Sequence, residues 1–321
     1  MTRIALVLIA ALAALPAAQA ADGDPPEARE LLADMVAAYQ QHSFSGRFLY
    51  MCAGQVSTLA LERSVIDGQV YERVSRLQGP VREVIRNNGQ TVSVHPDDSS
   101  TVLSSSDELA PFRFKGRDDI PEQYSAQLAG PGRVAGRAAW RLLIEPRDSH
   151  RYGYRLWLDQ QSHLLLKSEV LNGRNAALER VEFLSLKLDP GLERADFALP
   201  EDAGSAWSEE TGDGATGPEI QPGWLPEGFA MATRDDHRIR GRTGVLHSVT
   251  YSDGLATFTL FVEPASSAKP DGNLRRKGPT VVLARPIRQA RQGFVITLVG
   301  EVPPDTARRV LRDVTLEASG D

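Results

Sequence analysis

The chain contains 321 residues, of which 41% are hydrophobic and 24% are charged, and its formal net charge is −6. These fractions are typical of a globular protein, and the acidic balance excludes the class of strongly basic nucleic-acid-binding proteins. The length is more than one small core needs, so we expect two domains.

The first twenty residues have the pattern of a secretory signal peptide. Arg3 precedes an apolar run, Ile4–Leu15, and the small-residue motif Ala18-Gln19-Ala20 follows before Ala21. The apolar run is shorter than the roughly 20 residues that a membrane-spanning helix needs. The sequence therefore predicts export, with cleavage after Ala20 and a soluble mature chain.

The mature chain opens with a predicted helix. Asp24 to Glu27 provide an acidic N-cap and prolines in the first turn. The apolar residues that follow share one helical face, and these are Leu31, Leu32, Met35, Val36 and Tyr39. This helix is expected to cover a sheet.

Short strand-like runs separated by turn signals extend from Gly46 to about Leu188. The predicted strands are residues 55–63, 69–77, 81–86, 91–94, 164–171 and 178–188. Asn88-Gly89 and Asn172-Gly173 between such runs are strong hairpin signals. Residues 107–136 are less regular, and we expect a loop and short helix crossing the sheet there. Successive hairpins without long helices predict an antiparallel meander.

The single cysteine, Cys52, cannot form a disulfide within the chain. It ends the run Phe48–Cys52, in which apolar and polar residues mix, so a half-buried strand residue is favoured over a nucleophile.

An acidic segment divides the chain. Residues 200–221 carry six acidic and no basic residues, whereas residues 222–321 carry 14 basic against 11 acidic residues. We therefore predict an N-terminal domain over 21–199, an exposed flexible linker over 200–221, and a C-terminal domain over 222–321. The strands expected in the last domain are residues 247–251, 255–263, 280–284 and 294–300. A final helix after Pro303 would bury Val310, Leu311 and Val314.

No motif for catalysis or metal binding occurs in the sequence. The six histidines are scattered, and neither a zinc-protease motif, a nucleophile elbow nor a phosphate-binding loop is present. Asp235-Asp236-His237 is interpreted as a solvated loop within an arginine-rich stretch. We therefore predict a protein that is not an enzyme and has no cofactor, metal or catalytic residue.

Several sequence blocks resemble the MucB/RseB family of periplasmic sigma-factor regulators. In chain order they are Gly79–Val84, Tyr152–Asp159, Pro222–Phe229, Tyr251–Leu255 and Val299–Pro304. The last three are specific when they occur together, whereas the first two are weak alone. They span nearly the whole mature chain.

The resemblance implies an α+β fold that is mostly antiparallel β. A large N-terminal open, curved β-sheet, a half-barrel like that of lipoprotein carriers, would have helices across its concave face, and a smaller C-terminal α/β domain would follow.

The implied function is negative regulation of an envelope-stress sigma factor in the periplasm. The protein would bind the periplasmic domain of a single-span anti-sigma factor and protect it from proteolysis. Lipopolysaccharide or a related lipid would release it, no nucleic acid is involved, and homo-oligomerisation is left open.

Two sets of residues are candidates for these contacts. The residues expected at the partner surface are Arg234, Arg238, Arg240, Arg242 and Trp224. The residues expected to bind lipid on the sheet are Phe48, Tyr50, Tyr154 and Leu156. The alternatives are a solvated arginine-rich face, a Trp224 that anchors its own core, and an ordinary sealed sheet core. A lipid or lipoprotein carrier is the competing function, because a shared architecture does not determine function.

Overall fold

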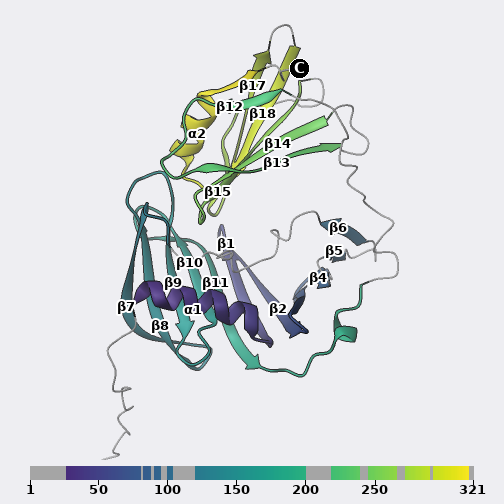
Figure 1. The fold of residues 1–321 in the computed structure, drawn as a ribbon, viewed down its shortest axis with the longest axis vertical. Helices are drawn as coiled ribbons and strands as arrows, with labels where there is room; N and C mark the ends of the chain where they lie inside the picture. The colour runs from purple at the N-terminus through teal and green to yellow at the C-terminus, as the bar shows by residue number, and fades with distance from the viewer. Residues whose placement is uncertain are drawn as a thin grey trace, which may run out of the picture.

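Figure 1 shows the protein as a computed structural model. The structure describes residues 27–80, 82–87, 90–94, 100–103, 120–199, 218–238, 245–265, 272–289 and 292–317. The predicted signal peptide with its cleavage site and nearly all of the predicted linker lie outside these ranges. Within them, no helix is long and apolar enough to cross a membrane.

The first unit, residues 27–199, is built on one antiparallel sheet of eleven described strands. In chain order they are β1 (Phe44–Cys52), β2 (Gln55–Ile66), β3 (Gln69–Arg76), β4 (Glu83–Asn87), β5 (Gln90–Val94), β6 (Ser100–Leu103), β7 (Tyr124–Val134), β8 (Arg137–Pro146), β9 (Gly153–Asp159), β10 (Leu165–Leu171) and β11 (Ala177–Leu188). Their order across the sheet is β6-β5-β4-β3-β2-β1-β11-β10-β9-β8-β7. Two meanders therefore join where β1 pairs with β11, and the predicted antiparallel meander is confirmed.

Tight turns set the register of these hairpins. The β1–β2 turn is Ala53-Gly54, with φ of 51° and 76°, and the β2–β3 turn is Asp67-Gly68, with φ of 51° and 75°. Two successive positive φ values match the twist of the flanking strands, which is why glycine occupies the second position.

Helix α1 (Ala28–Gln41) lies across one face of this sheet (Figure 1). Its buried residues are Leu31, Leu32, Met35, Val36 and Ala38. They share one core with Phe44 and Phe48 of β1 and with Leu156 of β9. The predicted helix is thus confirmed; its N-cap is Glu27, and the prolines before it lie outside the described residues.

The prediction of a loop and helix over residues 107–136 is wrong for the part that the structure describes. Tyr124–Val134 is strand β7, which forms one edge of the sheet. Pro131 and the glycines beside it break the alternation, but a register shift between Leu128 and Pro131 accommodates them. An edge strand tolerates proline and a bulge because only one side of it must pair.

The second unit, residues 218–317, has a sheet of order β13-β14-β15-β18-β17-β16 and a two-stranded ribbon, β12–β19. The elements are β12 (Glu219–Pro222), β13 (Ala230–Arg238), β14 (Val245–Ser252), β15 (Thr257–Pro264), β16 (Arg275–Lys277), β17 (Thr280–Gln289), β18 (Gln292–Gly300), α2 (Pro304–Arg312) and β19 (Val314–Glu317). The four predicted strands and the last helix are present. Its core includes Phe258, Leu260, Leu298, Val310 and Leu311.

Three expectations in this unit need correction. Glu219–Pro222 is a strand rather than the end of the linker, because it pairs with β19. Asp235 and its neighbours lie in β13 and not in a loop. Val314 begins β19 instead of ending the helix. The partner is distant in the chain for β12 and β19 and is the next strand for β13, and in each case strand pairing outweighs a weak local pattern.

Candidate functional site

The two units meet in a buried junction centred on an ion pair. Arg151 lies in the β8–β9 connection of the first unit and Asp253 in the β14–β15 turn of the second. Arg151 Nη1 is 2.7 Å from Asp253 Oδ2, and neither side chain is exposed. The Tyr124 hydroxyl donates to the same carboxylate oxygen at 3.0 Å. Arg151 also donates to the Glu227 carbonyl at 2.6 Å and to Asp148 Oδ1 at 3.1 Å.

Asp253 is held in place by its own turn. Its other oxygen, Oδ1, accepts the backbone N–H groups of Leu255 and Ala256 at 2.8 and 2.7 Å. This is the local hydrogen bonding for which aspartate is favoured in turns, and it leaves Oδ2 for Arg151 and Tyr124. Burial first, then Tyr154 and Asp253, raise the pKa of Tyr124 far above its usual 10.0. Tyr124 therefore stays a neutral hydrogen-bond donor.

A second set of contacts joins the first unit to helix α2, to the segment before that helix and to Trp224. The Tyr152 hydroxyl donates to the Val302 carbonyl at 3.2 Å, and His150 Nδ1 lies 3.2 Å from Thr306 Oγ1. The His150 ring packs edge-on against Trp224 at 5.0 Å between centroids. Arg309 lies over the same indole at 3.8 Å. Trp224 is thus part of the junction.

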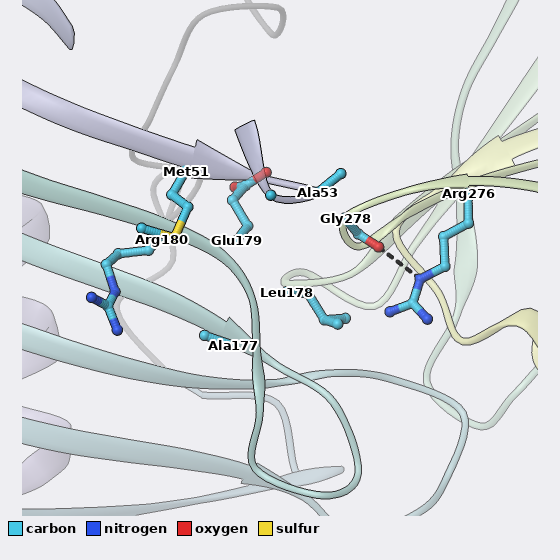
Figure 2. Close-up of a pocket in the computed structure, with 9 residues that line it drawn as sticks. Met51, Ala53, Ala177, Leu178, Glu179, Arg180, Arg276 and Gly278 are labelled. Carbon is cyan, nitrogen blue, oxygen red and sulfur yellow. Dashed lines mark hydrogen bonds between the residues drawn. The ribbon is translucent and has the colours of Figure 1, made fainter. Parts of the chain in front are cut away.

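A pocket of about 390 Å³ lies at this boundary between the units (Figure 2). The first unit contributes Met51, the Ala53-Gly54 turn and Ala177–Arg180 at the start of β11. The second unit contributes Arg276 and Gly278 of the β16–β17 hairpin, which Figure 2 shows on the opposite side. The wall is therefore built by both units and combines apolar and charged groups.

Gly278 brings the backbone of the second unit against the first unit. Its φ is +58°, and a Cβ there would lie 2.5 Å from Cys52 Sγ and 3.1 Å from the Leu178 carbonyl oxygen. Only glycine allows this backbone to rest on the buried Cys52. Cys52 is a strand residue as predicted, but it is fully buried rather than half-buried, and the Gly278 backbone packs against its thiol.

The charged groups of the pocket differ in how fully they are engaged. Glu179 is 7% exposed and accepts the Tyr50 hydroxyl at 2.9 Å. Arg180 pairs with Glu169 at 2.7 Å. Arg276 is exposed on β16, and its Nε donates to the Gly278 carbonyl at 2.8 Å. Burial first, and then Glu179, raise the pKa of Tyr50 well above its usual 10.0, so Tyr50 stays protonated.

The predicted lipid-binding residues are brought into one cluster, but most of them are sealed. Phe48, Tyr154 and Leu156 are 2%, 6% and 0% exposed and pack in the core that α1 covers. Only Tyr50 is partly exposed, and it reaches toward the pocket through Glu179. Contact between lipid and these side chains stays a prediction, because α1 lies over them.

Helix α1 is fastened to the sheet by a buried charged cluster. Arg63, 2% exposed, donates to the Tyr39 carbonyl at 2.6 Å and pairs with Glu72 at 2.5 Å. The Tyr39 hydroxyl donates to Glu72 at 2.6 Å, and Arg86 pairs with Glu72 at 2.6 Å. Lifting the C-terminal end of α1 would remove the Tyr39 carbonyl and hydroxyl from the buried Arg63 and Glu72, which costs free energy because buried charged groups would lose hydrogen-bond partners.

The predicted arginine surface is only partly described. Arg234 is exposed on β13, and Arg238 ends that strand. Arg240 and Arg242 lie outside the described residues. Trp224 contacts Arg309 and His150 instead of standing free beside this strand.

Sequence reasoning missed the junction residues. Tyr124, Arg151 and Asp253 come from three turns or strand starts that are far apart in the chain, and no periodicity links them. Among the described residues, no group of three or more His, Cys, Asp or Glu side chains could hold a metal ion.

Two protein-family models match the chain. The MucB/RseB N-terminal domain matches residues 27–201, and the MucB/RseB C-terminal domain matches residues 216–315. Sigma factor AlgU regulatory protein MucB of Pseudomonas aeruginosa is 35% identical over 316 residues, which is 98% of this chain and 97% of that protein. Sigma-E factor regulatory protein RseB of Haemophilus influenzae is 25% identical over 318 residues, 98% and 99% of the two chains.

A solved structure shares this fold. The crystal structure of MucB in complex with MucA(peri) superposes with a TM-score of 0.72 at 32% identity, covering 91% of this chain and 100% of that one. A crystal structure of MucB superposes with a TM-score of 0.64 at 30% identity, covering 90% and 98%. The open antiparallel sheet with a smaller second unit is thus the architecture of both.

Proposed function

Since this chain belongs to the MucB/RseB family, we propose that it is a periplasmic negative regulator of an envelope-stress sigma factor. It binds the periplasmic domain of a single-span membrane anti-sigma factor. In doing so it shields that domain from the protease that starts its degradation. The signal-peptide pattern of residues 1–20 supports export, with cleavage after Ala20.

One observation carries this proposal. A MucB solved together with MucA(peri) shares the fold over nearly the whole of both chains, at an identity that supports a common mode of action. A relative named as a sigma-factor regulatory protein is 35% identical over the same length. Both units are covered, so the proposal does not rest on the sheet architecture alone.

The site is suited to binding without turnover. Its buried polar groups, Arg151, Asp253 and Tyr124, are already paired with one another across the junction. A catalytic acid or base needs a proton-accepting position open to a substrate, and these groups are enclosed. We propose that the protein acts by occupying a surface of its partner.

Lipopolysaccharide or a related lipid relieves the protection in this proposal. Lipid that entered between α1 and the sheet would reach Phe48, Tyr154 and Leu156, which together offer an apolar surface. Because Tyr39 of α1 is hydrogen-bonded to the buried Arg63 and Glu72, lipid that entered beneath the helix would displace these contacts. Lipid and partner would then favour different positions of the helix. The exposed Arg234 on β13 supports contact with an acidic partner, and we propose that Arg238, Arg240 and Arg242, which follow it in the sequence, take part as well.

A protease-protection assay tests the function. The mature protein, the anti-sigma factor's periplasmic domain and its initiating protease are mixed with and without lipopolysaccharide. Slower cleavage that lipid restores is expected. Unchanged cleavage together with tight lipid binding would favour the alternative, a lipid or lipoprotein carrier. Sedimentation of the protein alone determines whether it forms homo-oligomers.

A further inference from the structure

We propose that the outer face of the first unit's sheet docks on the surface of an anionic phospholipid bilayer. The outer face is the one turned away from helix α1, which covers the other face (Figure 1). The docking patch on it is formed by Leu49, Val56, Leu77 and Leu184 and is rimmed by basic side chains. The docking itself does not depend on the proposed function.

Exposed apolar side chains gather on this face. Among the described residues, the large hydrophobic side chains that are exposed are Val56, Leu77, Leu184 and Met231. The first three belong to the first unit and are 52%, 44% and 54% exposed. Burying them against an apolar medium would therefore stabilise a complex, since an exposed apolar patch commonly marks a site of interaction with a protein or a membrane.

The patch is continuous because its members surround Leu49. Phe48 of β1 points into the core under α1, so Leu49, the next residue, points to the outer face. Leu49 is opposite Thr58 of β2 and Glu182 of β11. Val56 and Leu184 lie two residues along those strands and are diagonal neighbours of Leu49 on the same face. Leu77 follows β3, and its N–H donates to the Thr58 carbonyl at 3.0 Å.

The charges of this face favour an anionic surface. The outer face of β1, β2, β3, β10 and β11 carries five basic and three acidic side chains. The basic ones are Arg47, Arg73, Lys167, Arg180 and Lys187, and the acidic ones are Glu62, Glu169 and Glu182.

The carboxylates of this face are already paired with its cations. Glu62 lies 3.7 Å from Arg73, Glu169 lies 2.7 Å from Arg180, and Glu182 lies 3.2 Å from Lys167. Arg47 and Lys187 are exposed. Arg47 is opposite Ser185, which follows Leu184, and Lys187 lies farther along the same strand. The positive excess is therefore at the rim of the patch.

A bilayer suits this surface better than a protein does. All four patch residues are aliphatic, whereas protein interfaces are enriched in aromatic residues and methionine and depleted in lysine. Two copies of this face would also oppose their positive excesses. Aliphatic side chains can enter among lipid headgroups while neighbouring lysine and arginine residues attract the lipid phosphates. The inference therefore commits to anionic phospholipid as the occupant.

Docking by this face leaves helix α1 on the side of the sheet away from the bilayer. Under the proposed function, the partner is the periplasmic domain of a membrane-anchored protein. A regulator held at the membrane surface is then concentrated where that domain lies, which raises the occupancy of the complex at a given affinity. This consequence, unlike the docking, rests on the proposed function.

The test measures sedimentation of the full mature protein with sucrose-loaded vesicles. One set contains equal parts of phosphatidylglycerol and phosphatidylethanolamine, and the other contains phosphatidylcholine alone. Val56→Asp and Leu184→Asp place a charge in the patch, and Arg47→Glu reverses a charge at its rim. The matched controls are Met231→Asp, at the exposed hydrophobic residue of the second unit, and Arg29→Glu, at an exposed position of α1.

We expect the unaltered protein to sediment with the anionic vesicles and to bind the zwitterionic ones at least tenfold more weakly. Each patch or rim variant should weaken binding to anionic vesicles at least about fivefold, the change that one cation contributes near an anionic surface. Each control should bind within twofold of the unaltered protein. Added salt should weaken the binding, because it screens the attraction.

The opposite results overturn the inference. It is wrong if the unaltered protein does not sediment with anionic vesicles, if the variants bind as it does, or if both kinds of vesicle bind equally. It is also wrong if Leu184→Asp abolishes a self-association of the protein in the ultracentrifuge, because the face is then an interface between copies.

Titration calorimetry with the anti-sigma factor's periplasmic domain, without vesicles, separates the two proposals. Unchanged affinity of the patch variants supports docking on the membrane, whereas loss of affinity shows that the face binds protein and the inference is wrong. Absence of binding by the unaltered protein overturns the proposed function and leaves the membrane docking standing.

A fluorescence measurement keeps the inference testable if an aspartate variant fails to fold. In a Cys52→Ser background, Leu184→Cys and Met231→Cys each carry a polarity-sensitive fluorophore. The chain has no other cysteine, so each fluorophore reports on one position. Anionic vesicles should shift the emission at the Leu184 position to shorter wavelength and leave that at the Met231 position unchanged. An unshifted emission at the Leu184 position with saturating vesicles overturns the inference.

Discussion

Replacing Arg151 by methionine should loosen the junction between the two units. The substitution keeps a long apolar side chain but removes the cation that lies 2.7 Å from Asp253 Oδ2. It also leaves the Glu227 carbonyl without the donor that lies 2.6 Å away. Since both side chains of the ion pair are fully buried, solvent cannot compensate for the loss.

The magnitude follows from the contacts that remain. Removing one partner of a buried ion pair costs about 3–5 kcal/mol, because the other charge stays buried. Asp253 keeps two backbone N–H donors and the Tyr124 hydroxyl, so we expect the lower end, about 3 kcal/mol. At ~2–4 °C per kcal/mol, the melting temperature should fall by about 6–12 °C.

Calorimetric unfolding of the Arg151→Met, Asp253→Asn and double variants forms a thermodynamic cycle that isolates the pair. The double variant should lose less stability than the sum of the single ones, because the second substitution removes the charge that the first left unpaired. Arg308→Met is the control, since Arg308 pairs with Asp305 at the surface with both side chains exposed, and it should change stability little. Strictly additive losses, or single losses no larger than the control's, would falsify the assignment of the junction to this pair.

Three further predictions concern other parts of the chain. Asp159→Asn should reduce the loss of folding stability that accompanies a fall in pH. Burial raises the pKa of Asp159, but hydrogen bonds from Arg137 and Ser162 outweigh burial and hold that pKa below its usual 3.8. The stability that Asp159 contributes is thus present above about pH 4 and lost as the pH falls through the lowered pKa. Acid titration of the unaltered protein and of Asp159→Asn, followed by circular dichroism, measures this difference. Gly278→Ala should cost about 1–3 kcal/mol in chemical denaturation, because its φ of +58° and the contact with Cys52 Sγ both oppose a Cβ; an unchanged midpoint would contradict the close approach. Cys52→Ser should leave anti-sigma binding unchanged in calorimetry, since the buried thiol serves packing; loss of binding with an intact fold would show that the sulfur matters.

Local patterns in the sequence determined much of the secondary structure. The apolar stripe from Leu31 to Tyr39 specifies α1 because residues three and four apart share a helix face. Turns such as Asp67-Gly68 specify hairpins because positive φ values are needed at both positions. These signals act over a few residues, so a single sequence reveals them.

Other strands depended on their neighbours. Tyr124–Val134 contains Gly130-Pro131-Gly132, and Ala230–Arg238 contains an acid pair; neither looks like a strand in isolation. Pairing with β8 and β14 supplies the backbone hydrogen bonds that decide their conformation. Weak local preference was overridden by partners that the sequence does not identify.

The candidate site was decided by the tertiary structure. Phe48, Tyr154 and Leu156, which the sequence analysis proposed as a lipid-binding face, lie in one core cluster, and only the packing of α1 showed that this cluster is sealed. Arg151 and Asp253 are separated by 102 residues, and Tyr124 and Asp253 by 129. No period or motif connects residues at such distances, because their meeting depends on how two separate sheets dock. The sequence by itself determined helices, hairpins and family, whereas the buried ion pair and the pocket beside it exist only once the two units are in contact.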